Sequence, residues 1–204
     1  MREPINVSGM VLSASPVGEY DKRVVILTRE LGKITAFARG ARRMKSPLMA
    51  VSNPFVFGEF QVYEGRDSYT LSGANIKEYF LDLAQMQPGV YYGFYFLELA
   101  EYFGQEGNDE TQMLNLLYVT MNAIRRGKQD LRLVRCIFEL RTITISGEAP
   151  QMFSCMECGT KENLTVFSLR DSAIYCPNCG KTIRDPWPLQ PGTVLACRYI
   201  IAAP

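Results

Sequence analysis

The sequence contains no histidine among its 204 residues. Histidine is the commonest general base in enzymes, so its absence argues against the serine and cysteine hydrolase triads that depend on it. No pair of carboxylates with metal-ligand spacing takes its place, and we therefore predict that the protein is not an enzyme. Any zinc site must likewise be built from cysteines or carboxylates.

Long apolar runs and a strong net charge are also missing. No stretch approaches the roughly 18 apolar residues that a membrane span requires, and the N-terminus has no apolar signal region. We expect a cytoplasmic protein without a membrane partner, in which the six cysteines are metal ligands or buried thiols rather than disulfides. The net charge is only +1, with 11 basic and 8 acidic residues in 1–80 but 6 basic and 9 acidic in 81–150. Any nucleic-acid surface must therefore be local, and the first eighty residues hold the positive excess.

The first eighty residues contain a series of short segments typical of strands. Strands are predicted at 5–11, 24–27, 33–39, 55–63 and 69–76, with one or two helical turns at 46–52. Five short strands with a small helix between the third and fourth follow the order of an OB-fold, a small barrel that often binds single-stranded nucleic acid. An SH3-like or other small barrel is the alternative.

The third predicted strand runs into a cluster of positive charge. Alternation places its ring and its cations on the face opposite Ile34, Ala36 and Ala38, and Gly40 then ends the strand. Cations can neutralise phosphates, and an exposed ring can stack on bases. A solvated turn that contributes only solubility is the alternative reading. The candidate nucleic-acid contacts are Lys33, Phe37, Arg39, Arg42, Arg43 and Lys45.

From Pro88 onward the hydrophobic period changes from two to about 3.6. Three helices separated by short loops predict a small antiparallel bundle. We expect the aromatic run 91–96 to lie in its core. Arg132, Arg135 and Arg141 of the third helix are expected on a solvated face, and a groove that holds an acidic peptide is the alternative.

Two cysteine pairs form the most specific pattern in the chain. The first pair is Cys155 and Cys158, and the second is Cys176 and Cys179. Between Cys158 and Cys176 lie 17 residues, and a glycine follows each pair. Two residues between cysteines let both thiolates reach one ion, and four thiolates complete a closed tetrahedral Zn²⁺ shell, which indicates one structural zinc. An iron–sulfur cluster is the second interpretation, and a thioredoxin-type redox pair is a weaker one.

The predicted fold class is α+β and multidomain. We expect an N-terminal OB-fold β-barrel in 1–80, an α-helical bundle in 81–150 that is continued by 188–204, and a four-cysteine zinc-binding subdomain in 151–187.

Several short motifs accompany this order of barrel, helical bundle and four-cysteine subdomain. They are Gly18-Glu19-Tyr20-Asp21, Val25-Ile26-Leu27-Thr28, the run from Gly32 to Gly40 with Arg42-Arg43 after it, Glu78-Tyr79-Phe80, and the Phe138-Glu139-Leu140 helix that leads to Gly147 and Pro150. Together the order and the motifs resemble the RecO family of bacterial recombination mediator proteins. Two features depart from the family pattern, since its members usually continue with more C-terminal helix and Glu148 stands where an aromatic residue is expected.

The resemblance implies a non-catalytic, nucleoid-associated factor in DNA repair and recombination. Family members bind single- and double-stranded DNA, anneal complementary strands, work with the RecR partner, contact the acidic tail of single-strand-binding protein and help to load the RecA recombinase. By matching position, the resemblance assigns DNA contacts to the six residues of the third strand and turn, and zinc to the four cysteines. The alternative function is a protein-interaction scaffold in which the helical bundle binds partner proteins and DNA binding is secondary.

Overall fold

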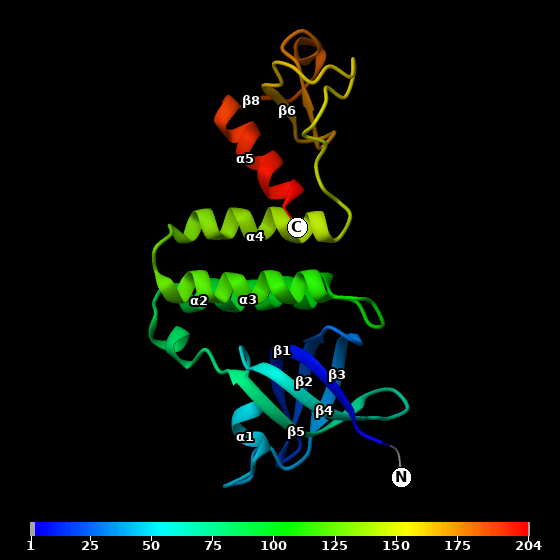
Figure 1. The fold of residues 1–204 in the computed structure, drawn as a ribbon, viewed down its shortest axis with the longest axis vertical. Helices are drawn as coiled ribbons and strands as arrows, with labels where there is room; N and C mark the ends of the chain where they lie inside the picture. The colour runs from blue at the N-terminus through cyan, green and yellow to red at the C-terminus, as the bar shows by residue number, and fades with distance from the viewer. Residues whose placement is uncertain (1–2, 204) are drawn as a thin grey trace. The chain divides into compact units, whose positions relative to one another are not determined.

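The structure is a computed structural model that describes residues 3–203 and divides into two compact units, one ending at Phe138 and the other beginning at Glu139 (Figure 1). Helix α4 (Leu131–Ile145) crosses the boundary between them. The other elements of the first unit are β1 (Ile5–Val17), β2 (Asp21–Thr28), β3 (Gly32–Ala38), α1 (Leu48–Val51), β4 (Phe57–Glu64), β5 (Tyr69–Glu78), the 3-10 helix η1 (Leu81–Gln85), α2 (Gly89–Phe103) and α3 (Thr111–Arg126).

The five strands of the first unit form a closed barrel. β1 pairs antiparallel with β2 and β4, and β3 pairs antiparallel with β2 and parallel with β5, which gives the order β1-β2-β3-β5-β4. With α1 between β3 and β4 this is an OB-like barrel, as the sequence predicted. β1 is longer than predicted because it continues to Val17, and a register shift between Val11 and Ser13 lets it bend between its two neighbours.

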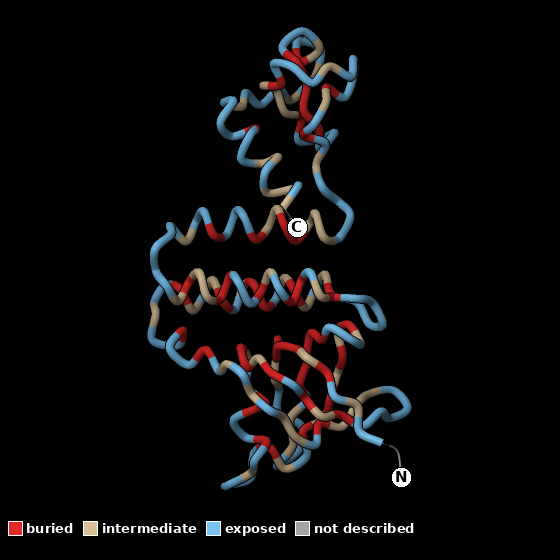
Figure 2. Tube along the Cα trace, viewed as in Figure 1, coloured by how far each residue is buried: buried red, intermediate tan, exposed pale blue. Residues whose placement is uncertain are grey.

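Side chains at every second strand position fill the barrel. Ile34, Ala36 and Ala38 of β3 are at most 2% exposed, and they meet Phe60 and Leu71 from β4 and β5. Figure 2 shows buried residues inside the barrel and also along α2 and α3. The alternation in the sequence therefore predicted the inward face of β3 correctly.

Part of the outer barrel face is covered by helices. Leu12 and Leu27 are buried although they lie outside the barrel core, because α2 contacts β1 and β2 and α3 contacts β2. Gly93 permits a close approach, since a Cβ at this position would lie 2.9 Å from Cε1 of Phe55. Phe55 itself has φ +73° and precedes β4, so the fourth strand begins two residues later than predicted.

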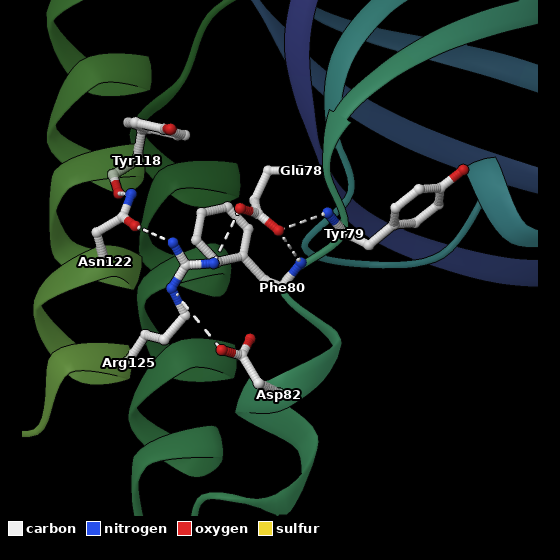
Figure 3. A network of polar contacts seen from close by, with 7 residues as sticks. All are labelled: Glu78, Tyr79, Phe80, Asp82, Tyr118, Asn122 and Arg125. Carbon is white, nitrogen blue, oxygen red and sulfur yellow. Dashed lines mark hydrogen bonds and ion pairs between the residues drawn. The ribbon is translucent and has the colours of Figure 1, made fainter.

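A polar network fixes α3 against the end of β5 (Figure 3). Oε1 of Glu78 accepts hydrogen bonds from the N–H groups of Tyr79 and Phe80 at 3.1 and 3.3 Å, and Oε2 accepts one from Nη1 of Arg125 at 2.9 Å. The Arg125 guanidinium also lies 5.3 Å from the centroid of the buried Phe80 ring. The hydrogen bond from Arg125 lowers the pKa of Glu78, and it outweighs the opposite effect of burial. The carboxylate thus holds the chain where it leaves the barrel for the helices.

The second unit contains a three-stranded sheet of order β7-β6-β8 and a helix. β6 and β7 form an antiparallel hairpin, and β8 pairs antiparallel with the other side of β6. The apolar core includes Met152, Leu164, Ile174 and Val194. The elements are β6 (Val166–Ser168), β7 (Ala173–Tyr175), the 3-10 helix η2 (Cys179–Thr182), β8 (Pro186–Pro188) and α5 (Pro191–Ala202).

Arg141 does not lie on a solvated face as the helical pattern suggested. It is only 9% exposed, and its Nη1 donates hydrogen bonds to the carbonyls of Ile200, Ile201 and Ala203 at 3.2, 3.4 and 2.7 Å. The last carbonyls of a helix have no partner within the helix and attract a cation, so Arg141 completes the C-terminal end of α5.

The expected domain segments 1–80, 81–150 with 188–204, and 151–187 stay a prediction, while the structure groups the chain into two compact units that divide between Phe138 and Glu139. Two other expectations differ from the structure. Of the aromatic side chains in the run 91–96 only that of Phe96 is buried, with its ring centroid 4.3 Å from that of Phe138, whereas Tyr91 is 63% exposed. Cys136, expected to be a buried thiol, is exposed.

In the part of the chain that the structure describes, no helix is both long and apolar enough to cross a membrane.

Candidate nucleic-acid interface and metal centre

The outward face of β3 carries the predicted ring and one of the predicted cations. Phe37 is half-buried and Arg39, just past the strand, is exposed, while the intervening Ala38 lies in the core. Arg23 of β2 is directly opposite Phe37, and its Nη2 donates a 3.3 Å hydrogen bond to Oγ1 of Thr35. A cation therefore lies beside the ring on the neighbouring strand.

Lys33 lies apart from the other predicted contacts. Its Nζ donates a 2.6 Å hydrogen bond to the carbonyl of Glu101 near the C-terminal end of α2, and its main-chain N–H donates to the carbonyl of Gln105 at 2.8 Å. Its side chain is thus occupied by the end of a helix that packs on the barrel. The assignment of Lys33 to the nucleic-acid contacts therefore stays a prediction, and a phosphate would compete with the Glu101 carbonyl for its ammonium.

The turn after β3 presents the remaining cations on a defined backbone. Ala41 and Leu48 anchor its two ends in the barrel core. Between them Arg42, Arg43 and Lys45 are exposed. The N–H of Gly40 donates to Oδ1 of Asp21 at 2.7 Å, and further main-chain hydrogen bonds run through the turn.

The connection between β1 and β2, together with the start of β2, contributes residues that the sequence analysis did not identify. The N–H of Arg42 donates to the carbonyl of Tyr20 at 2.8 Å, and the guanidinium of Arg43 lies 4.8 Å from the centroid of the Tyr20 ring. Nζ of Lys22 donates to Oδ1 of Asn53 at 2.8 Å. Burial, and after it the charge of Arg42, lowers the pKa of Lys22.

We use the term basic surface for the cations and rings on β2, on β3 and in the connections β1–β2 and β3–α1. Glu19 lies in the β1–β2 connection and Asp21 is the first residue of β2, where it accepts a hydrogen bond from the N–H of Gly40. The pairing of consecutive strands was the signal that could have revealed Arg23, since a short connection between β2 and β3 brings it opposite Phe37. The basic surface comprises Tyr20, Lys22, Arg23, Phe37, Arg39, Arg42, Arg43 and Lys45.

The four predicted cysteines converge in the second unit. The sulfur atoms of Cys155, Cys158, Cys176 and Cys179 all lie within 4.8 Å of one another, and those of Cys158 and Cys176 are 3.9 Å apart. Tetrahedral zinc with metal–sulfur distances near 2.3 Å requires sulfur atoms about 3.8 Å apart, so the spacing fits such an ion. The cluster can therefore hold a metal ion.

Main-chain N–H groups favour a negative charge on sulfur atoms of the cluster. Burial raises the pKa of the Cys155 thiol, but N–H groups of Cys158, Cys176 and Glu157 outweigh it and lower that pKa to about 6. The pKa of Cys179 rises instead to about 12, chiefly because of its hydrogen bond with Cys176. Adjacent thiolates repel one another, so all four ionise together only with a cation among them.

A second surface feature lies on the helices of the first unit. Tyr91, Tyr92, Tyr95 and Arg135 line a shallow pocket of about 270 Å³. The Arg135 guanidinium lies 5.6 Å from the centroid of the Tyr95 ring. By contrast, Nη2 of Arg132 pairs with Asp130 at 2.9 Å. Only Arg135 of the three predicted arginines thus accompanies an aromatic groove.

Comparison with known proteins gives the family of the chain. The model described as "Recombination protein O N terminal" matches residues 1–80, and that described as "Recombination protein O C terminal" matches residues 89–204. A DNA repair protein RecO from Alkaliphilus metalliredigens is 36% identical over 176 residues, which cover 86% of this chain and 72% of the relative. Its counterpart from Bacillus pumilus is 31% identical over 196 residues, which cover 95% and 75% respectively.

Proposed function

The chain belongs to the RecO family of DNA repair proteins, and on that premise we propose that it is a non-catalytic DNA-binding mediator of recombinational repair. It binds single- and double-stranded DNA, anneals complementary strands and, together with RecR, assists RecA loading on DNA coated by single-strand-binding protein. Its place of action is the cytoplasmic nucleoid.

The observation that carries this proposal is the pair Arg42 and Arg43, fixed by Tyr20 at the end of the barrel. Arg42 donates from its main-chain N–H to the carbonyl of Tyr20 and from its Nη1 to the carbonyl of Gly18 at 3.2 Å, and the guanidinium of Arg43 lies over the Tyr20 ring. Contacts within the protein therefore hold both guanidinium groups. Fixed cations beside aromatic rings suit a nucleic-acid strand, because cations neutralise phosphates and rings stack on bases.

The metal of the four-cysteine cluster is proposed to be one structural zinc ion. Four sulfur ligands close a tetrahedral shell and leave no position for a substrate or an activated water. Zinc held there would supply cross-linking of the two cysteine pairs rather than chemistry. Cys155 and Cys176 are buried in the apolar core of the second unit, so such an ion would stabilise that core.

A second candidate function is protein recognition by the helices. The pocket formed by Tyr91, Tyr92, Tyr95 and Arg135 supports it, because three rings beside one guanidinium suit a peptide that combines apolar side chains with a carboxylate. The acidic tail of single-strand-binding protein is the proposed occupant. In this version the helical part is a scaffold for partners, and DNA binding is secondary.

Single-strand binding across a salt series tests the leading proposal. An Arg39→Ala, Arg42→Ala, Arg43→Ala variant should bind more weakly than wild type, and its salt slope should be smaller by about 2, because each phosphate contact on a single strand contributes about 0.7. Arg29→Ala, Arg66→Ala, Arg126→Ala is the matched control, since it removes three exposed arginines outside the basic surface. Equal affinity of the two triple variants would overturn the assignment of the site.

A further inference from the structure

Met44 is the most exposed large apolar side chain in residues 3–203. It is 89% exposed, and it lies in the turn between β3 and α1, directly after Arg42 and Arg43 and before Lys45. In Figures 1 and 2 the connection between β3 and α1 leaves the barrel as an exposed loop. A single exposed methionine is common on protein surfaces, but here the backbone conformation and the neighbouring cations set Met44 apart.

The backbone holds Met44 at the corner of a closed turn. The N–H of Ser46 donates to the carbonyl of Arg43 at 3.1 Å, and the N–H of Arg43 donates to the carbonyl of Gly40 at 3.0 Å. Lys45 has φ +63°, a left-handed conformation that is uncommon for a residue other than glycine. Such strain is maintained only where the surroundings impose it, and it is concentrated at functional positions.

The cations beside Met44 are tied to a second segment of the barrel. Nη1 of Arg42 donates to the carbonyl of Gly18 at 3.2 Å, and Arg43 covers the ring of Tyr20. The side chain of Met44 therefore projects from a positively charged turn that is held by contacts with the β1–β2 connection. This combination suits a ligand with anionic edges and an apolar interior, and stacked bases between two phosphate backbones have that structure.

We propose that Met44 is a wedge that inserts between adjacent bases of bound DNA and unstacks them. The inference rests on the proposed DNA-binding function and adds the structural state of the DNA that is bound. Methionine is among the apolar side chains that minor-groove proteins insert at base steps, and its unbranched thioether adapts to an irregular gap. Flanking cations would hold the phosphates on either side while the step opens. A step that is already weakened should therefore be preferred.

The test uses the full chain and a duplex that carries 2-aminopurine, a base whose fluorescence rises when it is unstacked. Wild type should raise the fluorescence, and it should prefer a duplex with one mismatch over a fully paired one by about tenfold, because the mismatched step costs less to open. Met44→Ala should lose both effects while its salt slope stays unchanged. Met156→Ala is the matched control, because Met156 is also exposed, at 59%, but lies in the second unit.

Each outcome decides the matter. If Met44→Ala binds DNA normally and matches wild type in fluorescence and mismatch preference, the wedge proposal is wrong and the proposed DNA-binding function stands. Wild type that binds no DNA overturns the proposed function and the wedge together. Vesicles of phosphatidylcholine and phosphatidylserine supply the remaining arm: if Met44→Ala lowers vesicle binding and leaves the DNA signals intact, the tip serves a lipid surface and the wedge is wrong.

Discussion

The ammonium of Lys33 lies 2.6 Å from the carbonyl oxygen of Glu101, and this hydrogen bond joins the start of β3 to α2. The carbonyls at the C-terminal end of a helix attract cations, so the contact combines a charge-assisted hydrogen bond with the helix dipole. Lys33 and Arg39 belong to the same alternating pattern, yet one supports the packing of the barrel and the other is free to meet a ligand.

We expect Lys33→Met to lower the free energy of unfolding by about 1.5–3 kcal/mol, the usual contribution of a hydrogen bond to a charged group. Its affinity for single-stranded DNA should stay close to that of wild type. Urea unfolding and a DNA titration measure the two quantities. Lys45→Met is the control, and it should show the reverse pattern because Lys45 is exposed. A Lys33→Met protein that is fully stable but binds DNA weakly would instead support Lys33 as a nucleic-acid contact.

The ion pair of Glu78 and Arg125 predicts a loss of stability in acid. The pKa of Glu78 is lowered in the folded protein, first by the hydrogen bond from Arg125, so the unfolded chain binds the proton more readily. The pair therefore contributes its full stability above the ordinary carboxyl pKa of about 4.3, and the contribution disappears as the pH falls through the lower folded value.

Glu78→Gln should accordingly reduce stability at neutral pH by about 1–3 kcal/mol and flatten the dependence on pH in the acid range. Thermal unfolding between pH 3 and pH 7 would show both effects. Glu59→Gln is a suitable control, since Glu59 pairs with Lys77 at 2.8 Å but both side chains are about half exposed. An exposed pair of this kind contributes about 0–1 kcal/mol, and equal losses in the two variants would contradict the prediction.

Metal analysis should find one equivalent of zinc per chain. Cys158→Ser should lose most of the metal and make residues 139–204 more sensitive to proteolysis, because two of the ligands lie in the core of that unit. Cys136→Ser, which changes an exposed cysteine outside the cluster, should retain the metal. Iron and absorbance in the visible range would indicate an iron–sulfur cluster instead of zinc. A Cys158→Ser protein that retains its full content of metal would contradict the four-cysteine site.

The aromatic pocket predicts selective loss of acidic-peptide binding. Arg135→Ala should weaken binding of a peptide with the acidic tail of single-strand-binding protein by about tenfold, because a charge-assisted hydrogen bond is lost. Arg132→Ala should have a small effect, since Arg132 pairs with Asp130 and lies outside the pocket. Fluorescence anisotropy of a labelled peptide gives both values. Equal weakening by the two variants would indicate general charge attraction instead of a defined pocket.

Features that depend on local geometry could be predicted from the order of residues alone. Successive side chains of a strand point to opposite faces, so the pattern of β3 was sufficient to place Ile34 inside the barrel and Phe37 outside it. The spacing of Cys155 and Cys158 allows both sulfurs to reach one point with little help from distant parts of the chain. The order of strands and small helix was likewise sufficient for an OB-like barrel.

Which outward residues remain accessible depends instead on tertiary packing. A strand pattern separates inside from outside, but it does not reveal that Lys33 on the outside is hydrogen-bonded to the end of α2. The contact of Arg43 with Tyr20 joins residues from separate connections, and Arg141 finds the end of a helix 59 to 62 residues further along the chain. Such contacts depend on how elements dock, and docking is set by packing over the whole surface rather than by any local period.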